Sequence, residues 1–142
     1  KRLIALMNGQ EGSSQIEILE GRYEPERFLE AAKGLERCKE GGERCVRCFA
    51  LRLGETARVA AEGGFDFFTT SLTISPLKNS ALLNQIGAQE GERYGVRFLP
   101  SDFKKNNGYL RSTQLSRLYG LYRQNYCGCI YSKVEASDRR QP

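Results

Sequence analysis

Apolar residues recur every three or four positions between residues 43 and 62, in the middle of the chain. This period places them on one face of a helix, and two glycines that follow directly provide a stop. A second helix with the same period is predicted over residues 80–94. A third begins near Pro25 and ends at Gly34. The apolar positions of the first helix are Val46, Phe49, Leu53, Ala57 and Ala60.

Short runs of β-branched and aromatic residues separate these helices and predict strands over residues 15–19, 65–73 and 96–99. Because strands alternate with helices, the expected class is α/β with a parallel sheet. In such sheets, functional groups gather beyond the carboxyl ends of the strands. Two hydroxyl-rich or charged stretches stand there, at residues 69–76 and 101–105.

The composition is that of an ordinary globular protein and predicts one domain over residues 1–132. Residues 133–142 are charged and poor in apolar groups, which is typical of a disordered tail. No apolar run is long enough to cross a bilayer or to form a secretory signal, so we expect a cytoplasmic protein without a membrane partner. A net charge of +5 suits a polyanionic partner such as RNA, and equally an ordinary basic surface.

Five cysteines and the absence of histidine narrow the possible chemistry. Without imidazole, this chain cannot form a nucleophile paired with histidine or a zinc site that uses histidine. An odd number of unevenly spaced cysteines does not suit a secreted disulfide framework. Thiolate ligands or catalytic thiols fit better, and Cys38, alone in a polar loop, is expected to be an incidental thiol.

Cys45 and Cys48 stand three positions apart at the predicted start of a helix. Residues at this spacing share a face, so both sulfurs can reach one metal or cluster. The positive helix end favours thiolate there, and Arg44 and Arg47 add positive charge and argue against burial. Packing in the core is the alternative. A thioredoxin-like pair is disfavoured because the motif follows a glycine-rich loop rather than a strand.

Cys127 and Cys129 flank a single glycine within a run of tyrosines and polar residues. Two thiols this close can form a strained, readily reduced disulfide, can bind one metal or cluster, or can pack as small buried side chains. Nearby Tyr122 and Arg123 belong to a set of aromatic and basic residues that could cradle an unpaired RNA base or simply pack. Spacing alone leaves these alternatives open.

Four sequence blocks together resemble the QueH type of epoxyqueuosine reductase. The first, residues 41–53, contains Gly-Gly-Glu-Arg-Cys-Val-Arg-Cys-Phe, and the second, residues 65–79, contains Thr-Thr-Ser-Leu-Thr-Ile-Ser-Pro. The third, residues 99–109, begins Leu-Pro-Ser-Asp-Phe-Lys-Lys, and the fourth runs from residue 119 to 132 across the second cysteine pair. The resemblance covers residues 21–132.

This resemblance implies a Rossmann-like parallel sheet with flanking helices, of the nucleotide α-hydrolase (HUP-like) kind. It also implies the reduction of epoxyqueuosine to queuosine at the wobble position of tRNA, the last step of queuosine biosynthesis. The implied cofactor is a [4Fe–4S] cluster, with an additional iron as a further candidate. Besides tRNA that bears epoxyqueuosine, the reaction needs an electron donor, which the sequence does not identify.

By the same resemblance, Cys45 and Cys48 would be two of the four cluster ligands, and Cys127 and Cys129 would form a redox-active disulfide. The family's other two ligands are adjacent cysteines near the amino terminus, and this sequence contains no such pair. We therefore expect an amino-terminally truncated chain that lacks a first strand and helix, with residues 1–7 as the end of a helix. Such a chain would retain the cluster weakly or not at all, and would then be inactive.

Three further residues are candidates for roles around the reaction. Asp102 could transfer a proton or cap a helix, and Lys104 and Lys105 could bind tRNA phosphate or be solvated charges. The alternative function is a zinc-stabilised RNA-binding module without catalysis, in which the four paired cysteines surround one metal. A degenerate structural remnant would bind no metal.

Overall fold

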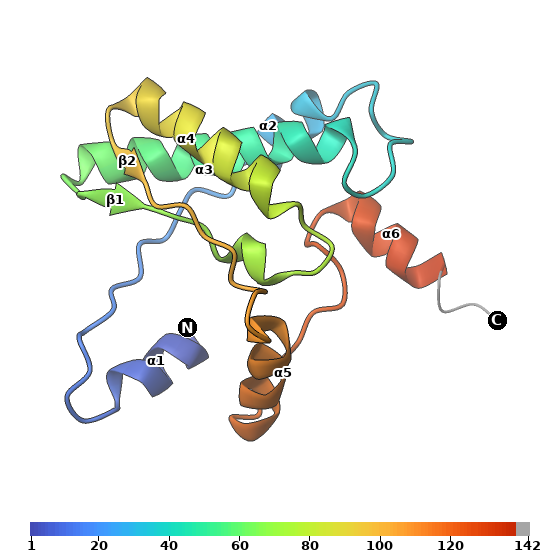
Figure 1. Ribbon diagram of the computed structural model, residues 1–142. Helices are drawn as coiled ribbons and strands as arrows, with labels where there is room; N and C mark the ends of the chain where they lie inside the picture. Colours follow the sequence, from blue (N-terminus) through green and yellow to red (C-terminus); the bar gives the residue numbers. More distant parts are fainter. Residues whose placement is uncertain (139–142) are drawn as a thin grey trace.

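The computed structural model describes residues 1–138, and its centre is a pair of helices, α3 (Glu43–Glu62) and α4 (Ser80–Tyr94). Both helices lie where the apolar periodicity predicts them, and they pack side by side (Figure 1). Asn79 starts α4 by accepting a hydrogen bond from the Leu82 N–H. Gly95 ends this helix in the left-handed conformation, with a φ of 72°.

A small parallel sheet lies against the helix pair and consists of β1 (Phe67–Phe68) and β2 (Arg97–Phe98). Phe67 pairs with Arg97, and Phe68 pairs with Phe98. The expectation of a mixed α/β arrangement, with parallel strands and flanking helices, is confirmed at this level. The strand predicted over residues 96–99 is shorter in the structure, and it pairs with β1 alone within the described part of the chain.

Two of the predicted strands differ from the structure. The strand over residues 65–73 is wrong beyond Phe68, because Thr70 accepts a hydrogen bond from the Leu72 N–H and begins a 3₁₀ helix, η1 (Ser71–Ile74). The strand over residues 15–19 does not form, and its apolar residues are exposed. A β-branched run without a ladder partner does not become a strand through propensity alone.

The apolar core lies between α3, α4 and the two strands. Phe68 and Phe98 meet edge to face there, with their ring centroids 5.1 Å apart. α4 approaches β2 so closely that a Cβ on Gly91 would lie 2.6 Å from the carbonyl oxygen of Val96, so only glycine fits. The buried residues of this core are Cys45, Phe49, Leu53, Ala57, Ala60, Phe68, Leu83, Ile86 and Val96.

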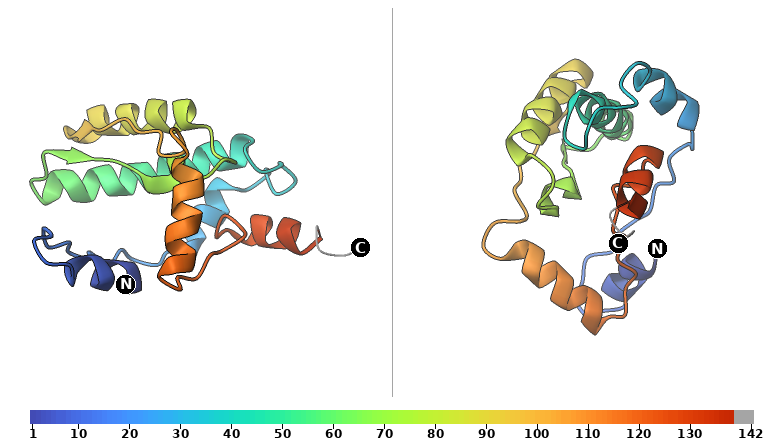
Figure 2. Two further views of the ribbon diagram at one scale, coloured as in Figure 1. Left: turned by 60° about the horizontal axis from the view of Figure 1, so that its bottom comes forward. Right: turned by 90° about the vertical axis from the view of Figure 1, so that its right-hand side faces the viewer.

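Shorter helices surround this framework: α1 (Arg2–Asn8), α2 (Pro25–Ala31), α5 (Gly108–Leu118) and α6 (Ile130–Asp138). α1, α2 and α5 contain no buried residue. Figures 1 and 2 show α1 and α5 apart from the α3–α4 pair, whereas α6 lies near the beginning of α3. The helix predicted over residues 1–7 is present as α1, and its being the end of a longer helix stays a prediction.

Residues 133–138 do not form the disordered tail that the sequence predicts, because they continue α6. The rest of that predicted tail, residues 139–142, lies outside the described residues. Among the helices of residues 1–138, none combines the length and the apolar character that a membrane crossing requires.

Candidate functional site

Cys45 and Cys48 lie one turn apart at the amino-terminal end of α3. The Cys45 side chain is buried, and its Sγ accepts a hydrogen bond from the Gly41 N–H at 3.2 Å. Gly41 has a φ of 90°, a conformation that favours glycine and presents this amide to the sulfur. Hydrogen bonds to ligand sulfurs are one of the means by which proteins tune metal centres. The local structure therefore suits the role predicted for this pair.

The sequence predicts that Arg44 and Arg47 keep the neighbouring cysteines from being buried, and the structure agrees with this for Arg47 but not for Arg44. Arg44 is itself 2% exposed, and Cys45 next to it is buried, so the expectation is wrong at this position. Arg47 matches it, since its exposed side chain pairs with Glu43 on the helix surface, with 2.8 Å between nitrogen and oxygen. Cys48, on the same side of α3 as Cys45, is partly buried.

Cys127 and Cys129 lie in the loop that leads into α6, and both are free thiols. Gly128 between them has a φ of 92°, which allows the loop to turn sharply. Ser132 holds the loop against the first turn of α6. Its Oγ accepts a hydrogen bond from the Cys127 N–H at 2.9 Å, and its own N–H donates to the Cys129 Sγ at 3.4 Å. The disulfide between these two cysteines stays a prediction.

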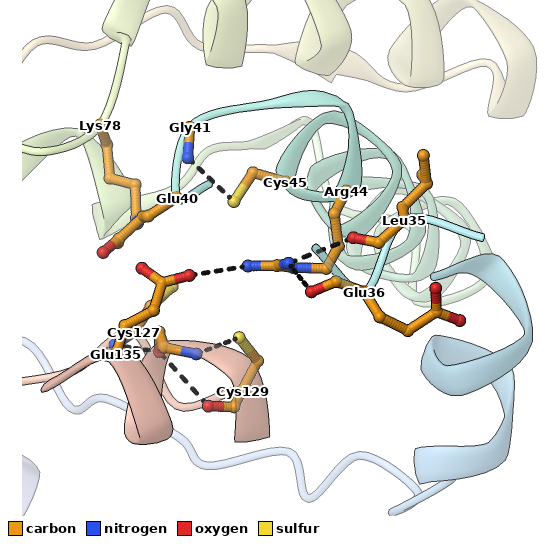
Figure 3. A network of polar contacts seen from close by, with 11 residues as sticks. Leu35, Glu36, Glu40, Gly41, Arg44, Cys45, Lys78, Cys127, Cys129 and Glu135 are labelled. Carbon is orange, nitrogen blue, oxygen red and sulfur yellow. Dashed lines mark hydrogen bonds and ion pairs between the residues drawn. The ribbon is translucent and has the colours of Figure 1, made fainter. Parts of the chain in front are cut away.

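The fold brings the two cysteine pairs, which are far apart in the sequence, to one place. Figure 3 shows Cys45 at the start of α3 facing Cys127 and Cys129 from the loop before α6. Burial raises the pKa of the Cys48 thiol above its usual value of 9.0, and the positive charge of Arg52 opposes this shift. The other three paired cysteines raise the pKa of Cys48 further.

The donor chemistry of this site suits a metal or cluster only in part. Within residues 1–138, no group of three or more cysteine, histidine or acidic side chains converges closely enough to hold a metal ion. The zinc site with four thiolates therefore has no support from this geometry. Cys45 and Cys48, with their helical spacing and the amide that donates to Cys45, fit as two ligands of a larger centre.

Lys78 belongs to this site, although the sequence analysis gives it no role. Its side chain is nearly fully buried and forms an ion pair with Glu40. Burial acts to lower the pKa of the ammonium, but the Glu40 carboxylate, which accepts a hydrogen bond from it, and the nearby Cys127 side chain leave the pKa raised overall. A buried positive charge thus lies beside Cys127. The signal in the sequence is a single lysine directly before Asn79, the residue that caps α4.

Asp102 and Lys104 form an ion pair, with 3.0 Å between oxygen and nitrogen. The ion pair with Lys104 holds the pKa of the Asp102 carboxyl below its usual range, although burial opposes this shift. Lys104 also donates to the carbonyl oxygen of Lys78 at 3.2 Å. Lys104 thus connects Asp102 to the Lys78 segment. Lys105 is exposed, and its role as a phosphate contact stays a prediction.

Tyr122 and Arg123 follow α5 and lie in the chain segment that leads to the second cysteine pair. The Tyr122 side chain is 83% exposed. The Arg123 guanidinium donates to the Ser116 Oγ at 3.3 Å and lies 5.6 Å from the centre of the Tyr109 ring. An exposed ring beside an anchored arginine is compatible with base stacking, which stays a prediction for both residues.

A cavity of about 590 Å³ between α2, α3 and α4 is separate from the cysteine site, since no cysteine lines it. Its arginines are engaged in ion pairs within the protein, so we do not count it as part of the candidate site. These pairs are Arg27 with Glu24, Arg47 with Glu43, Arg58 with Glu55 and Arg93 with Glu90.

Comparison with known proteins agrees with the sequence blocks. A model of the family described as epoxyqueuosine reductase QueH matches residues 1–135. A Streptococcus pyogenes serotype M1 protein of that name is 45% identical over 139 residues, which are 97% of this chain and 54% of that protein. A Staphylococcus epidermidis protein with the same name is 43% identical and covers 90% of this chain and 54% of its own length.

A third relative with this name, from Thermotoga maritima, is 36% identical over 127 residues, which are 87% of this chain and 66% of that protein. The chain thus spans about half the length of the streptococcal and staphylococcal relatives that it matches. The family match extends over nearly all of the chain and includes both cysteine pairs. The chain belongs to the epoxyqueuosine reductase QueH family.

Proposed function

We propose that this chain carries part of the catalytic centre of an iron–sulfur epoxyqueuosine reductase, which reduces epoxyqueuosine in tRNA to queuosine. The observation that carries the proposal is the meeting of two cysteine pairs at one site, Cys45 with Cys48 and Cys127 with Cys129. Membership of the family supplies the substrate, since the relatives bear the name of this reaction. The oxidoreductase class follows from the same name.

Cys45 and Cys48 are proposed to hold a [4Fe–4S] cluster as two of its four ligands, and an additional iron is proposed as a second cofactor. When bound, such a cluster supplies electrons one at a time and can polarise an oxygen atom. The amide of Gly41, which donates to the Cys45 sulfur, keeps that sulfur oriented. The resemblance assigns the other two ligands to an adjacent cysteine pair, which these 142 residues do not contain.

Cys127 and Cys129 are proposed to act as a dithiol that is oxidised to a disulfide. Removing the epoxide oxygen needs two electrons and two protons, and two thiols supply both when they form one disulfide. The products are then the alkene, one water molecule and the disulfide. An external electron donor returns the disulfide to two thiols. The buried ammonium of Lys78 beside Cys127 provides positive charge where negative charge develops on sulfur.

The remaining parts of the proposal concern the fold and the partners. The two parallel strands with their helices are proposed to be part of a Rossmann-like sheet of the nucleotide α-hydrolase kind. Lys105 and Tyr122 are proposed to contact the tRNA, the lysine through phosphate and the tyrosine through a base, because both side chains are exposed. A tRNA substrate also points to a cytoplasmic protein.

The proposal is tested with the protein at the length that cells produce, purified without oxygen and reconstituted with iron and sulfide. Incubation with reductant and tRNA that carries epoxyqueuosine should yield queuosine, measured by mass spectrometry of the digested tRNA. Cys38→Ala serves as the control variant, since this thiol lies outside the two pairs, and it should retain activity. No queuosine from a preparation with a full complement of iron and sulfide would falsify the proposal. Zinc at one equivalent, without iron, would favour the zinc-stabilised RNA-binding module instead.

A further inference from the structure

Arg44 is a fully buried arginine that stands directly before Cys45, and it connects two parts of the chain. Its Nη1 donates to the carbonyl oxygens of Leu35 and Glu36, at 3.2 Å and 2.9 Å. These contacts fix the guanidinium against the turn that precedes α3. Because a buried charge is costly without partners, an arginine at a 2% exposed position indicates that its donors are needed.

The other edge of the same guanidinium faces α6. The Nη2 of Arg44 donates to the Oε1 of Glu135 at 3.3 Å. The Cζ of the guanidinium lies over the Tyr131 ring, 4.4 Å from the ring centre. Tyr131 in turn meets Phe28 of α2 edge to face, at 6.1 Å between ring centres. Figure 3 shows Arg44 between the turn on one side and Glu135 on the other.

α6 and the loop of the second cysteine pair form one local unit. The Lys133 N–H donates to the Cys129 carbonyl oxygen at 3.1 Å, which starts the helix at the cysteine. Ser132, 3% exposed, binds the backbone of Cys127 as well as Cys129. Contacts that fix the position of α6 therefore also fix the positions of Cys127 and Cys129.

Apolar packing contributes little to the position of this unit. Ile130 and Val134 are both more than half exposed, and Ser132 is the buried residue among those of α6 whose side chains the structure describes. The ion pair of Glu135 and the stacking of Tyr131, both on Arg44, are thus the principal contacts that the structure shows between this unit and α3.

We propose that Arg44 is a positioning residue, which holds α6, and with it Cys127 and Cys129, at the fixed place opposite Cys45 and Cys48. This inference rests on the proposed function for the redox role of the four thiols. The proximity itself does not depend on that role, since it follows from the contacts of one side chain with the turn before α3 and with α6.

The test measures the distance between the two pairs by chemical cross-linking of the metal-free protein in a Cys38→Ser background. The reagent is a short bifunctional thiol alkylator that becomes fluorescent when both of its arms have reacted. The fluorescence measures the yield of cross-links, and peptide mapping identifies which cysteines are joined. Links within Cys127 and Cys129 are the internal standard. In the parent protein, links between the first and second pair should form readily.

Arg44→Met should reduce links between the pairs by about tenfold, the factor expected for one lost charge-assisted hydrogen bond. Glu135→Gln keeps an acceptor but removes the charge, so it should reduce these links by a smaller factor, and both variants should leave the internal standard unchanged. Arg44→Lys keeps a cation near Glu135 and should recover part of the yield. Arg47→Met is the matched control, because Arg47 lies on the same helix but pairs only on the surface. It should leave every link unchanged.

Circular dichroism establishes that each variant is folded before its links are compared. If Arg44→Met does not fold, the cross-linking yield of Glu135→Gln tests the inference, because the Glu135 side chain is partly exposed and its change should leave the protein folded. Links between the pairs at the parent yield in a folded Arg44→Met or in Glu135→Gln would overturn the inference. Neither cluster nor tRNA enters this measurement, so a failed activity assay and a failed positioning test are separate results.

Discussion

Cys45 lies in the apolar core with Phe49 and Leu53, whereas Cys127 and Cys129 lie in a loop that polar contacts hold in place. The first region is a helix pair packed on two strands, with glycines where backbone and side chain approach closely. The second region has few buried side chains and is attached through single charged groups, above all Arg44 and Lys78. One centre is thus assembled from two regions whose positions have different physical causes.

The two regions should therefore respond differently to mutation. A change in the α3–α4 core should lower the stability of the whole framework, because many residues share that packing. A change at one polar contact of the second region should move Cys127 and Cys129 while the framework stays folded. The following experiments separate these two kinds of effect, beginning with the largest.

Leu83→Ala should have the largest effect on stability. The Leu83 side chain is completely buried on α4 against α3, and its truncation leaves a cavity that costs about 2–5 kcal/mol of unfolding free energy. Urea denaturation followed by circular dichroism measures this. Leu77→Ala is the control at an exposed leucine and should change stability by less than about 0.5 kcal/mol. Equal effects of the two variants would show that the core does not lie where we place it.

Lys78→Met should have a smaller effect, about 1–2 kcal/mol, because it leaves the Glu40 carboxylate without its buried partner. The pKa of Lys78 is raised in the folded state, so the contribution of its ammonium is fully present below its usual pKa of 10.5 and is lost as the pH rises through the higher folded value. Denaturation of the parent and the variant at several pH values measures this contribution.

The difference between parent and Lys78→Met should stay constant from neutral pH up to about pH 10 and shrink only above that. Lys105→Met, at an exposed lysine, is the control and should have little effect at any pH. A difference that already disappears between pH 7 and pH 9 would contradict the assignment of a raised pKa to Lys78.

The reactivity of Cys48 should show the smallest change. Its alkylation rate tests whether the second region influences a thiol of the first region. Because burial raises the pKa of this thiol, its alkylation by iodoacetamide in the metal-free protein should be slower at pH 8 than that of free cysteine. Cys127 also raises the pKa of Cys48, so Cys127→Ala should accelerate the reaction. Arg52 lowers it, so Arg52→Met should slow the reaction. Identical rates in the parent and in Cys127→Ala would show that Cys48 does not sense the second region.

The sequence predicts the first region well and the second poorly, for a physical reason. α3 and α4 follow from local periodicity and from stop signals such as Gly95, which act within a few residues. Residues 133–138 of α6 fall in the predicted disordered tail, because this charged segment has little apolar character of its own. Its position depends on Arg44, far away in the sequence, and no local pattern contains that contact.

The candidate site shows the same division. Spacing alone identified both cysteine pairs, since a helical repeat and a single intervening glycine are local features. Their meeting, the burial of Arg44 and the place of Lys78 beside Cys127 depend on tertiary packing. The strand predicted over residues 65–73 is too long for a local reason, because Thr70 caps the 3₁₀ helix η1 and so ends the extended segment.

The central claim is that the two pairs serve one centre in different roles, and analysis of single cysteine variants tests it most directly. Iron, labile sulfide and queuosine formation are measured for Cys45→Ala and Cys127→Ala, both purified without oxygen at the length that cells produce. We predict that Cys45→Ala loses iron and activity together, whereas Cys127→Ala retains iron and sulfide and forms no queuosine. Loss of iron in Cys127→Ala to the same extent as in Cys45→Ala would contradict the separate roles of the two pairs.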